Sequence, residues 1–180
     1  MPNPLDAVID LTTVETPAAV IDRSRVAANA ERVTRYCAEH GLVWRPHIKT
    51  HKSTEVARMQ LAAGAGGLTV ATPHEAEVMA DVCSDLLLAY PLVGEARIDR
   101  VLALPDHVRL RVALDSTEVL EPLAAAARAA KRDLEVLVEV DMGLGRVGVQ
   151  GVQAAVALAR QVVDTPGVTW RGVLFYAGHV

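Results

Sequence analysis

Cysteines, lysines and long apolar runs are all scarce in this sequence. Cys37 and Cys83 are the only two cysteines among 180 residues, and neither belongs to a CxxC pair or a Cys/His ligand spacing. Neither a disulfide scaffold nor a zinc knuckle is indicated, and a reducing cytoplasm is the expected compartment. No apolar run approaches the roughly 20 residues that a membrane span requires, and MPNPLDAVIDLTTVETP lacks the basic start and apolar core of a signal peptide. We expect a soluble protein without a membrane partner.

A surplus of positive charge is also missing. The formal net charge is -4, and the basic residues are scattered rather than gathered into a stripe, so nothing predicts binding to nucleic acid. With 51% apolar residues, a chain of this length can bury one sizeable core, and we expect a single domain over 1–180. The composition therefore favours small-molecule chemistry.

Three lysines accompany 15 arginines, and two of them, Lys49 and Lys52, lie within RPHIKTHK at 45–52. Lys131 belongs to an ordinary charged cluster. A role that any cation could fill would be expected to go to arginine in this chain. Arginine cannot serve as a primary amine that loses its proton and attacks a carbonyl, because its guanidinium stays charged. The stretch therefore predicts a lysine that forms a covalent Schiff base.

Strand and helix patterns alternate along the whole chain. Strands are predicted at 42–49, 67–71, 85–90, 108–114, 134–141 and 168–176, with helices around 26–40, 53–64, 95–104, 117–131 and 150–163. TPHE at 72–75 starts one more helix, where Thr72 can cap and Glu75 can close a capping box. Alternating elements predict an α/β fold with a parallel sheet covered by helices.

A (β/α)8 TIM-type barrel or a doubly wound sheet would satisfy this order. A complete barrel has eight strands, whereas about six are found here, so we expect an incomplete barrel that forms the front portion of a longer design. Its open edges would invite pairing with another chain, for example in a homodimer.

Within the predicted strand at 43–49, Arg45, His47 and Lys49 share one face, which we expect to line the barrel interior. Lys49 would lie at the carboxyl end of this strand, where barrel enzymes place their chemistry. Burial beside Arg45 would favour its neutral amine. Lys52 is expected to be solvated. The alternative is a cluster of cations with no catalytic role.

GLGRVG at 143–148 is a literal GxGxxG after a predicted strand. A dinucleotide-binding Rossmann loop is one interpretation, but the helical pattern resumes only near Val149 and the next strand lacks a terminal acid. The other interpretation is a strand-end loop that presents Arg146, with Asp141 fixing the loop. A plain surface turn with an exposed Arg146 is the third.

Tyr176 ends the last predicted strand, where its phenol could reach a ligand or pack in the core. His179 has no assigned role. Paired carboxylates, a Ser/His/Asp order and a metal-ligand spacing are not found, so no metal site is predicted.

Six stretches together resemble the D-threonine aldolase and D-serine dehydratase group of alanine racemase-like, fold type III enzymes: TPAAVIDRSRVAANAERV, RPHIKTHKS, TVATPHEAEVM, YPLVG, VEVDMGLGRVGV and GVLFYAGH. The resemblance implies a pyridoxal 5'-phosphate cofactor bound covalently to Lys49. It places Arg146 near the pyridine nitrogen, Tyr176 at the cofactor, and His47 and Arg45 as supporting residues.

The resemblance also implies a lyase for D-β-hydroxy amino acids, acting by aldol cleavage or by dehydration. Members of the group use a divalent metal whose ligands lie in a C-terminal β domain, and that domain and the last two barrel strands have no counterpart here. Two alternatives therefore stand beside the enzyme: a protein that binds the cofactor without turnover, and an inactive truncated barrel.

Overall fold

The computed structural model describes residue 10 and residues 12–179. The stretch 1–17, from which the absence of a signal peptide was predicted, lies partly outside these residues. The elements are, in chain order, α1 (Arg23–Glu39), the 3-10 helix η2 (Ile48–Thr50), α2 (Thr54–Ala62), β1 (Leu68–Val70), α3 (Pro73–Met79), β2 (Asp85–Leu88), α4 (Glu95–Leu102), β3 (Arg109–Leu114), α5 (Thr117–Ala130), β4 (Glu135–Val140), α6 (Val152–Asp164) and β5 (Thr169–Phe175).

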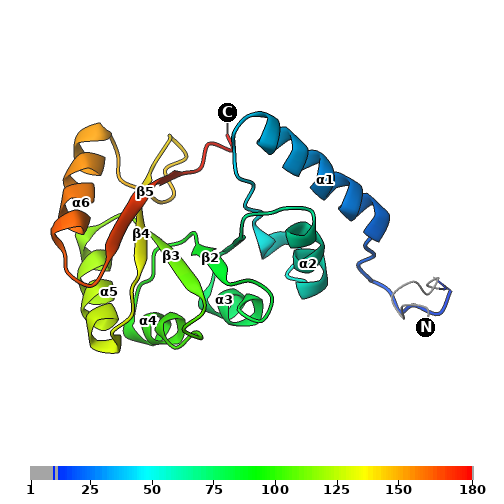
Figure 1. Cartoon of the computed structure of the whole chain (residues 1–180), viewed down its shortest axis with the longest axis horizontal. Coiled ribbons are helices and arrows are strands. Elements are labelled where there is room, and N and C mark those ends of the chain that lie inside the picture. The colour runs from blue at the N-terminus through cyan, green and yellow to red at the C-terminus, as the bar shows by residue number, and fades with distance from the viewer. Residues whose placement is uncertain (1–9, 11, 180) are drawn as a thin grey trace.

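The five strands found among the described residues form one parallel sheet in the order β1-β2-β3-β4-β5. Each strand therefore pairs with the next one in the chain, and α3 to α6 cover the outer face of the curved sheet (Figure 1). A doubly wound dinucleotide fold reverses its strand order near the first strand, and no reversal occurs here. The predicted partial barrel is confirmed, and the Rossmann interpretation of GLGRVG loses its structural context.

The core lies between the sheet and its covering helices. Leu88, Leu110 and Leu114 of the strands are buried with Val101 of α4 and Leu123 of α5. Burial of each such side chain contributes about 1.5–3 kcal/mol relative to exposure. This layer fixes the positions of the strand ends from which candidate site residues emerge.

Polar side chains cap the first three α-helices. Asp22 accepts a hydrogen bond from the Arg25 backbone N–H, and Ser53 accepts one from Val56. Thr72 accepts one from Glu75, as predicted for TPHE. Only half of the capping box forms, because the Glu75 carboxylate accepts from the N–H of Ala71 rather than from that of Thr72. Within the described part of the chain, no helix is both long and apolar enough to cross a bilayer.

Candidate active site

The RPHIKTHK segment is not the regular strand that the sequence predicted over 42–49. His47 makes a single parallel bridge with Thr69 of β1, and the chain then turns into η2. Pro46 has no N–H to donate to a ladder, although its carbonyl accepts a 2.8 Å hydrogen bond from the Thr69 N–H. The first strand of the expected barrel is thus reduced to an extended segment, and the sheet has five strands instead of six.

Lys49 lies in η2, immediately after the buried Ile48, and its side chain is exposed. Its backbone N–H donates to Nδ1 of His47 over 3.3 Å. Burial and the nearby charge of Lys49 lower the pKa of His47 below its ordinary value. The expectation that Lys49 would be buried beside Arg45 was wrong, because the turn at 48–50 breaks the alternation of a strand.

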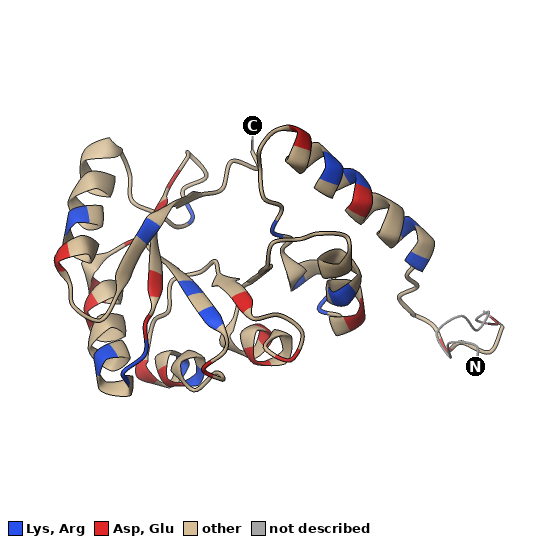
Figure 2. Ribbon diagram, viewed as in Figure 1, with Lys and Arg blue, Asp and Glu red and all other residues tan. Residues whose placement is uncertain are grey.

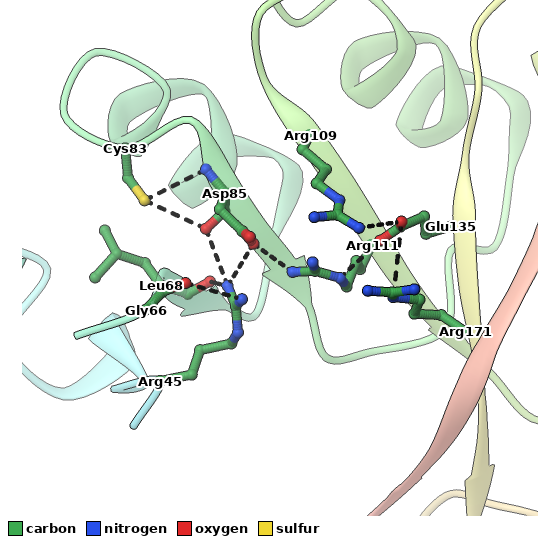
Figure 3. A network of polar contacts seen from close by, with 9 residues as sticks. All are labelled: Arg45, Gly66, Leu68, Cys83, Asp85, Arg109, Arg111, Glu135 and Arg171. Atoms are coloured by element: carbon green, nitrogen blue, oxygen red, sulfur yellow. Dashed lines mark hydrogen bonds and ion pairs between the residues drawn. The ribbon is translucent and has the colours of Figure 1, made fainter. Parts of the chain in front are cut away.

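Arg45 belongs to a different site, at the opposite ends of the strands. Its Nη1 lies 2.7 Å from Oδ1 of Asp85, the first residue of β2. A network of basic and acidic side chains continues from there to β5 (Figure 3), and Figure 2 shows the alternating charges on neighbouring strands. The other members of the network are Arg109 and Arg111 of β3, Glu135 of β4 and Arg171 of β5.

Asp85, Arg109 and Glu135 are the first residues of their strands, and Arg111 and Arg171 are the third residues of theirs. The network therefore lies toward the amino ends of the sheet, away from the carboxyl ends where barrel enzymes bind ligands. Gly67 allows the close approach of Arg45, since a Cβ there would lie 2.0 Å from its Nη1. Arg45 therefore ties the first segment to the sheet rather than supporting a site at the other end.

The glycine-rich loop after β4 is fixed by Asp141. Its Oδ1 accepts hydrogen bonds from the N–H groups of Gly143 over 2.9 Å and Gly145 over 3.1 Å. These two bonds lower the pKa of Asp141, which keeps the carboxylate ionised. The predicted role of Asp141 as a loop-fixing residue is confirmed, and Arg146 follows directly.

Arg146 and Tyr176 lie against each other at the carboxyl ends of β4 and β5. The Arg146 Cζ lies 5.5 Å from the centroid of the Tyr176 ring, which is within the range of a cation–π contact. The two strands pair along their lengths, with Val140 opposite Phe175, so residues that follow them are neighbours. Both side chains remain exposed.

Glu139 is a candidate site residue that was not predicted from the sequence. This residue of β4 is 3% exposed, and its Oε2 has no hydrogen-bond partner among the described residues. It lines a small recess together with Arg146 and Tyr176. Burial and then the charge of Asp115 raise the pKa of Glu139, and Arg146 opposes them. The two-residue period of LEVLVEVD, which puts Glu139 on the same strand face as Glu135, was the available signal.

The structure thus forms two pairs from the predicted site residues. His47 and Lys49 stand beside β1 at one edge of the sheet, whereas Arg146 and Tyr176 follow β4 and β5 at the other edge. No hydrogen bond or ion pair between described residues joins the two pairs. The parallel bridge of His47 with Thr69 puts Lys49 level with the carboxyl end of β1, and Arg146 and Tyr176 follow the carboxyl ends of β4 and β5. Both pairs therefore lie at the same rim of the sheet, hereafter the carboxyl-end rim.

A metal ion would need a cluster of ligand side chains, at the carboxyl-end rim or elsewhere. Across residues 10 and 12–179, no three His, Cys, Asp or Glu side chains gather in a way that could hold an ion.

Comparison with known proteins places this geometry in a family. Residues 21–180 match the family described as alanine racemase, N-terminal domain. The chain belongs to this family. It is 34% identical over its full length to a D-threonine aldolase of Arthrobacter sp., of which it covers 48%. It is also 37% identical to a D-threo-3-hydroxyaspartate dehydratase of Delftia sp., with 93% of this chain and 45% of the relative aligned.

The fold agrees with that of solved relatives. The crystal structure of a D-threonine aldolase from Filomicrobium marinum matches 91% of this chain and 44% of its own chain, with a TM-score of 0.87 and 30% identity. The present chain thus spans about half the length of the relatives that it matches. Membership in the alanine racemase N-terminal domain family implies a pyridoxal phosphate cofactor.

Proposed function

We propose that this chain is the cofactor-binding barrel portion of a lyase that acts on D-β-hydroxy amino acids, with Lys49 as the amine that binds pyridoxal 5'-phosphate. The observation that carries the proposal is the position of Lys49: an exposed primary amine on a short turn at the carboxyl-end rim. The named activities of the relatives, an aldolase and a dehydratase for D-amino acids, support the substrate class.

The residues present fit one side of such a cofactor. Lys49 supplies the amine, His47 stands beside it, and the stacked pair of Arg146 and Tyr176 supplies a cation and a flat ring at the same rim. Barrel phosphate sites are typically built by the loops after strands seven and eight, and the described sheet has five strands. We therefore expect the phosphate to be held by another polypeptide segment. Any divalent metal would likewise need ligands from such a segment.

The cofactor, when bound, withdraws electrons and so permits a bond to the substrate α-carbon to break. The residues of this chain bind, orient and move protons around it. Burial and the charge of Lys49 lower the pKa of His47, which favours the neutral imidazole, and its Nδ1 accepts the backbone N–H of Lys49 and so helps to shape the turn. Arg146 presents a positive charge, and its guanidinium lies over the ring of Tyr176.

The open edge of the sheet supports a covering partner. Trp170, Val173 and Phe175 of β5 are exposed, and an apolar recess of Val152, Val156 and Val163 on α6 continues from them. Unpaired strand edges recruit other strands, so we expect a second copy or another segment to cover this face.

Titration of the 180-residue protein with pyridoxal phosphate tests the proposed function. We expect the red-shifted absorbance of an imine in the wild type and its loss in Lys49→Arg, which keeps the charge but removes the attacking amine. D-Threonine and D-serine with a supplied divalent metal then distinguish turnover from binding alone. An imine without consumption of either amino acid would favour a cofactor-binding protein, and no imine in the wild type would reject the proposal.

A further inference from the structure

Lys52 has a backbone conformation that lysine rarely adopts. Its φ is +50°, and among the described residues only Lys131 shares a positive φ without being glycine. Lys131 ends helix α5, where a left-handed residue is common. Lys52 instead follows η2, and its N–H donates to the Ile48 carbonyl over 2.8 Å. Such a conformation persists where the surroundings hold it, and it is found at functional turns.

The side chain of Lys52 reaches a buried carboxylate. Its Nζ lies 2.8 Å from Oε1 of Glu75, and the exposed fractions of the two side chains are 64% and 7%. The second oxygen of Glu75 accepts a 2.7 Å hydrogen bond from the N–H of Ala71, directly after β1. Glu75 thus joins the end of β1 to the end of the RPHIKTHK segment, with one oxygen for each.

Glu75 remains ionised despite its burial. Burial alone would raise the pKa of its carboxyl, but the hydrogen bonds from Lys52 and Ala71 and the charges of Lys52 and His47 lower it overall. An ionised buried carboxylate is stable only with such partners. Removing the Lys52 amine would therefore leave the Glu75 carboxylate as an uncompensated buried charge, which destabilises the fold.

The turn that carries Lys49 is consequently fixed on both sides. Before it, His47 bridges to Thr69 and Ile48 is 0% exposed in the core. After it, Lys52 is bound to Glu75. We propose that Glu75 is a positioning residue which, through Lys52, holds the 47–52 turn so that the Lys49 amine faces the cofactor. This inference rests on the proposed function, and it gives the second lysine of RPHIKTHK a role distinct from that of the first.

Helix α3 offers a matched control. Glu77 lies two residues after Glu75 and pairs with Arg100 over 2.5 Å. This pair is partly exposed, and no hydrogen bond or ion pair between described residues joins it to the turn. If any lost ion pair on α3 weakened the site, Glu77→Gln would weaken it too. If the site depends on the position of the turn, only loss of the pair between Glu75 and Lys52 should weaken it.

The experiment compares the wild type with Glu75→Gln, Lys52→Met, Lys52→Arg and Glu77→Gln. The concentration of pyridoxal phosphate that gives half of the imine absorbance is measured first. Borohydride reduction and peptide mapping then give the share of label on Lys49. We expect Glu75→Gln and Lys52→Met to raise the half-saturating concentration by about tenfold or more, as misplaced reactive groups do. Lys52→Arg, which keeps a cation for Glu75, should recover most of the loss, and Glu77→Gln should match the wild type.

A change in which lysine carries the reduced label distinguishes a loss of positioning from a general loss of stability. In Glu75→Gln the amine of Lys52 loses its partner, so label should move from Lys49 toward Lys52. Circular dichroism shows whether each variant is folded. If Glu75→Gln does not fold, Lys52→Met alone tests the inference, because the side chain of Lys52 is largely exposed and its replacement should not prevent folding. Wild-type affinity in folded Lys52→Met would overturn the inference while leaving the proposed function intact. Failure of the wild type to label Lys49 would remove both.

Discussion

The carboxylate of Asp85 forms ion pairs with two arginines: its Oδ1 lies 2.7 Å from Nη1 of Arg45 and also contacts Nη1 of Arg111. Arg45 comes from the segment before β1 and Arg111 from β3, so one carboxylate joins three neighbouring parts of the barrel at the amino ends of its strands. The network separates a structural end of the sheet from the carboxyl-end rim, where the lysine turn and the glycine-rich loop lie.

Replacement of Asp85 tests this structural role. Asp85→Asn keeps the shape but removes the charge that both guanidinium groups face, so we expect unfolding free energy to fall by about 1–3 kcal/mol. Urea denaturation measures the change. Asp81→Asn, at an exposed position before β2, is the control and should change stability by less than about 0.5 kcal/mol. Equal stability of the two variants would show that the network contributes nothing.

Acid should destabilise the protein through the same carboxylates. Burial would raise the pKa values of Asp85, Glu135 and Glu75, but their hydrogen-bonded cations lower them below the ordinary 3.8 for Asp and 4.5 for Glu. The unfolded state then binds more protons, so the stabilisation is present above these ordinary values and is lost as pH falls through the lower folded values. We expect unfolding free energy to decline between about pH 5 and pH 2, and Asp85→Asn to flatten the decline. A pH-independent stability over that window would contradict the ion pairs.

The glycine-rich loop allows a paired test. Gly148 has φ +103°, and a Cβ there would lie 2.5 Å from the Asp141 nitrogen, so Gly148→Ala should destabilise by more than about 2 kcal/mol and displace Arg146. Gly145 has φ +67° but open space around it, so Gly145→Ala should cost only about 1 kcal/mol. Thermal unfolding of both variants measures the difference, and a larger loss in Gly145→Ala would refute the packing described for the loop.

Ile48 connects the core to the lysine turn. Its side chain is 0% exposed, and Ile48→Ala should cost about 2–5 kcal/mol, because a cavity is added to the lost burial. Leu144→Ala, at an exposed position of the glycine-rich loop, is the control and should be nearly neutral in denaturant unfolding. A small loss in Ile48→Ala would mean that the turn is not anchored by packing.

Much of the fold was predictable because it depends on local patterns. The alternation of strands and helices, the cap at Thr72 and the loop-fixing carboxylate of Asp141 all follow from periodicity or from short-range hydrogen bonds. The first strand was predicted wrongly since the polar alternation of Arg45, His47 and Lys49 outweighed the missing donor of Pro46. The proline, which cannot donate to a strand ladder, correctly indicated that this segment is not a regular strand.

Long-range partners were the other failure. Nothing local to RPHIKTHK says that Arg45 pairs with Asp85, 40 residues later, or that Lys52 reaches Glu75. These contacts depend on how neighbouring strand ends come together in the sheet, which periodicity does not specify. Glu139 could have been predicted, because the two-residue period of its strand places it on the same face as Glu135.

Lys49 is expected to be the one lysine of three whose amine reacts with pyridoxal phosphate. The wild-type protein is mixed with pyridoxal phosphate, reduced with borohydride, digested, and mapped by fragment spectra that separate Lys49 from Lys52 and Lys131. We expect the reduced label to lie predominantly on Lys49, and we expect Lys49→Arg to lose it without transfer of equal label to either other lysine. Label distributed evenly over the three lysines, or concentrated on Lys52 or Lys131, would contradict it.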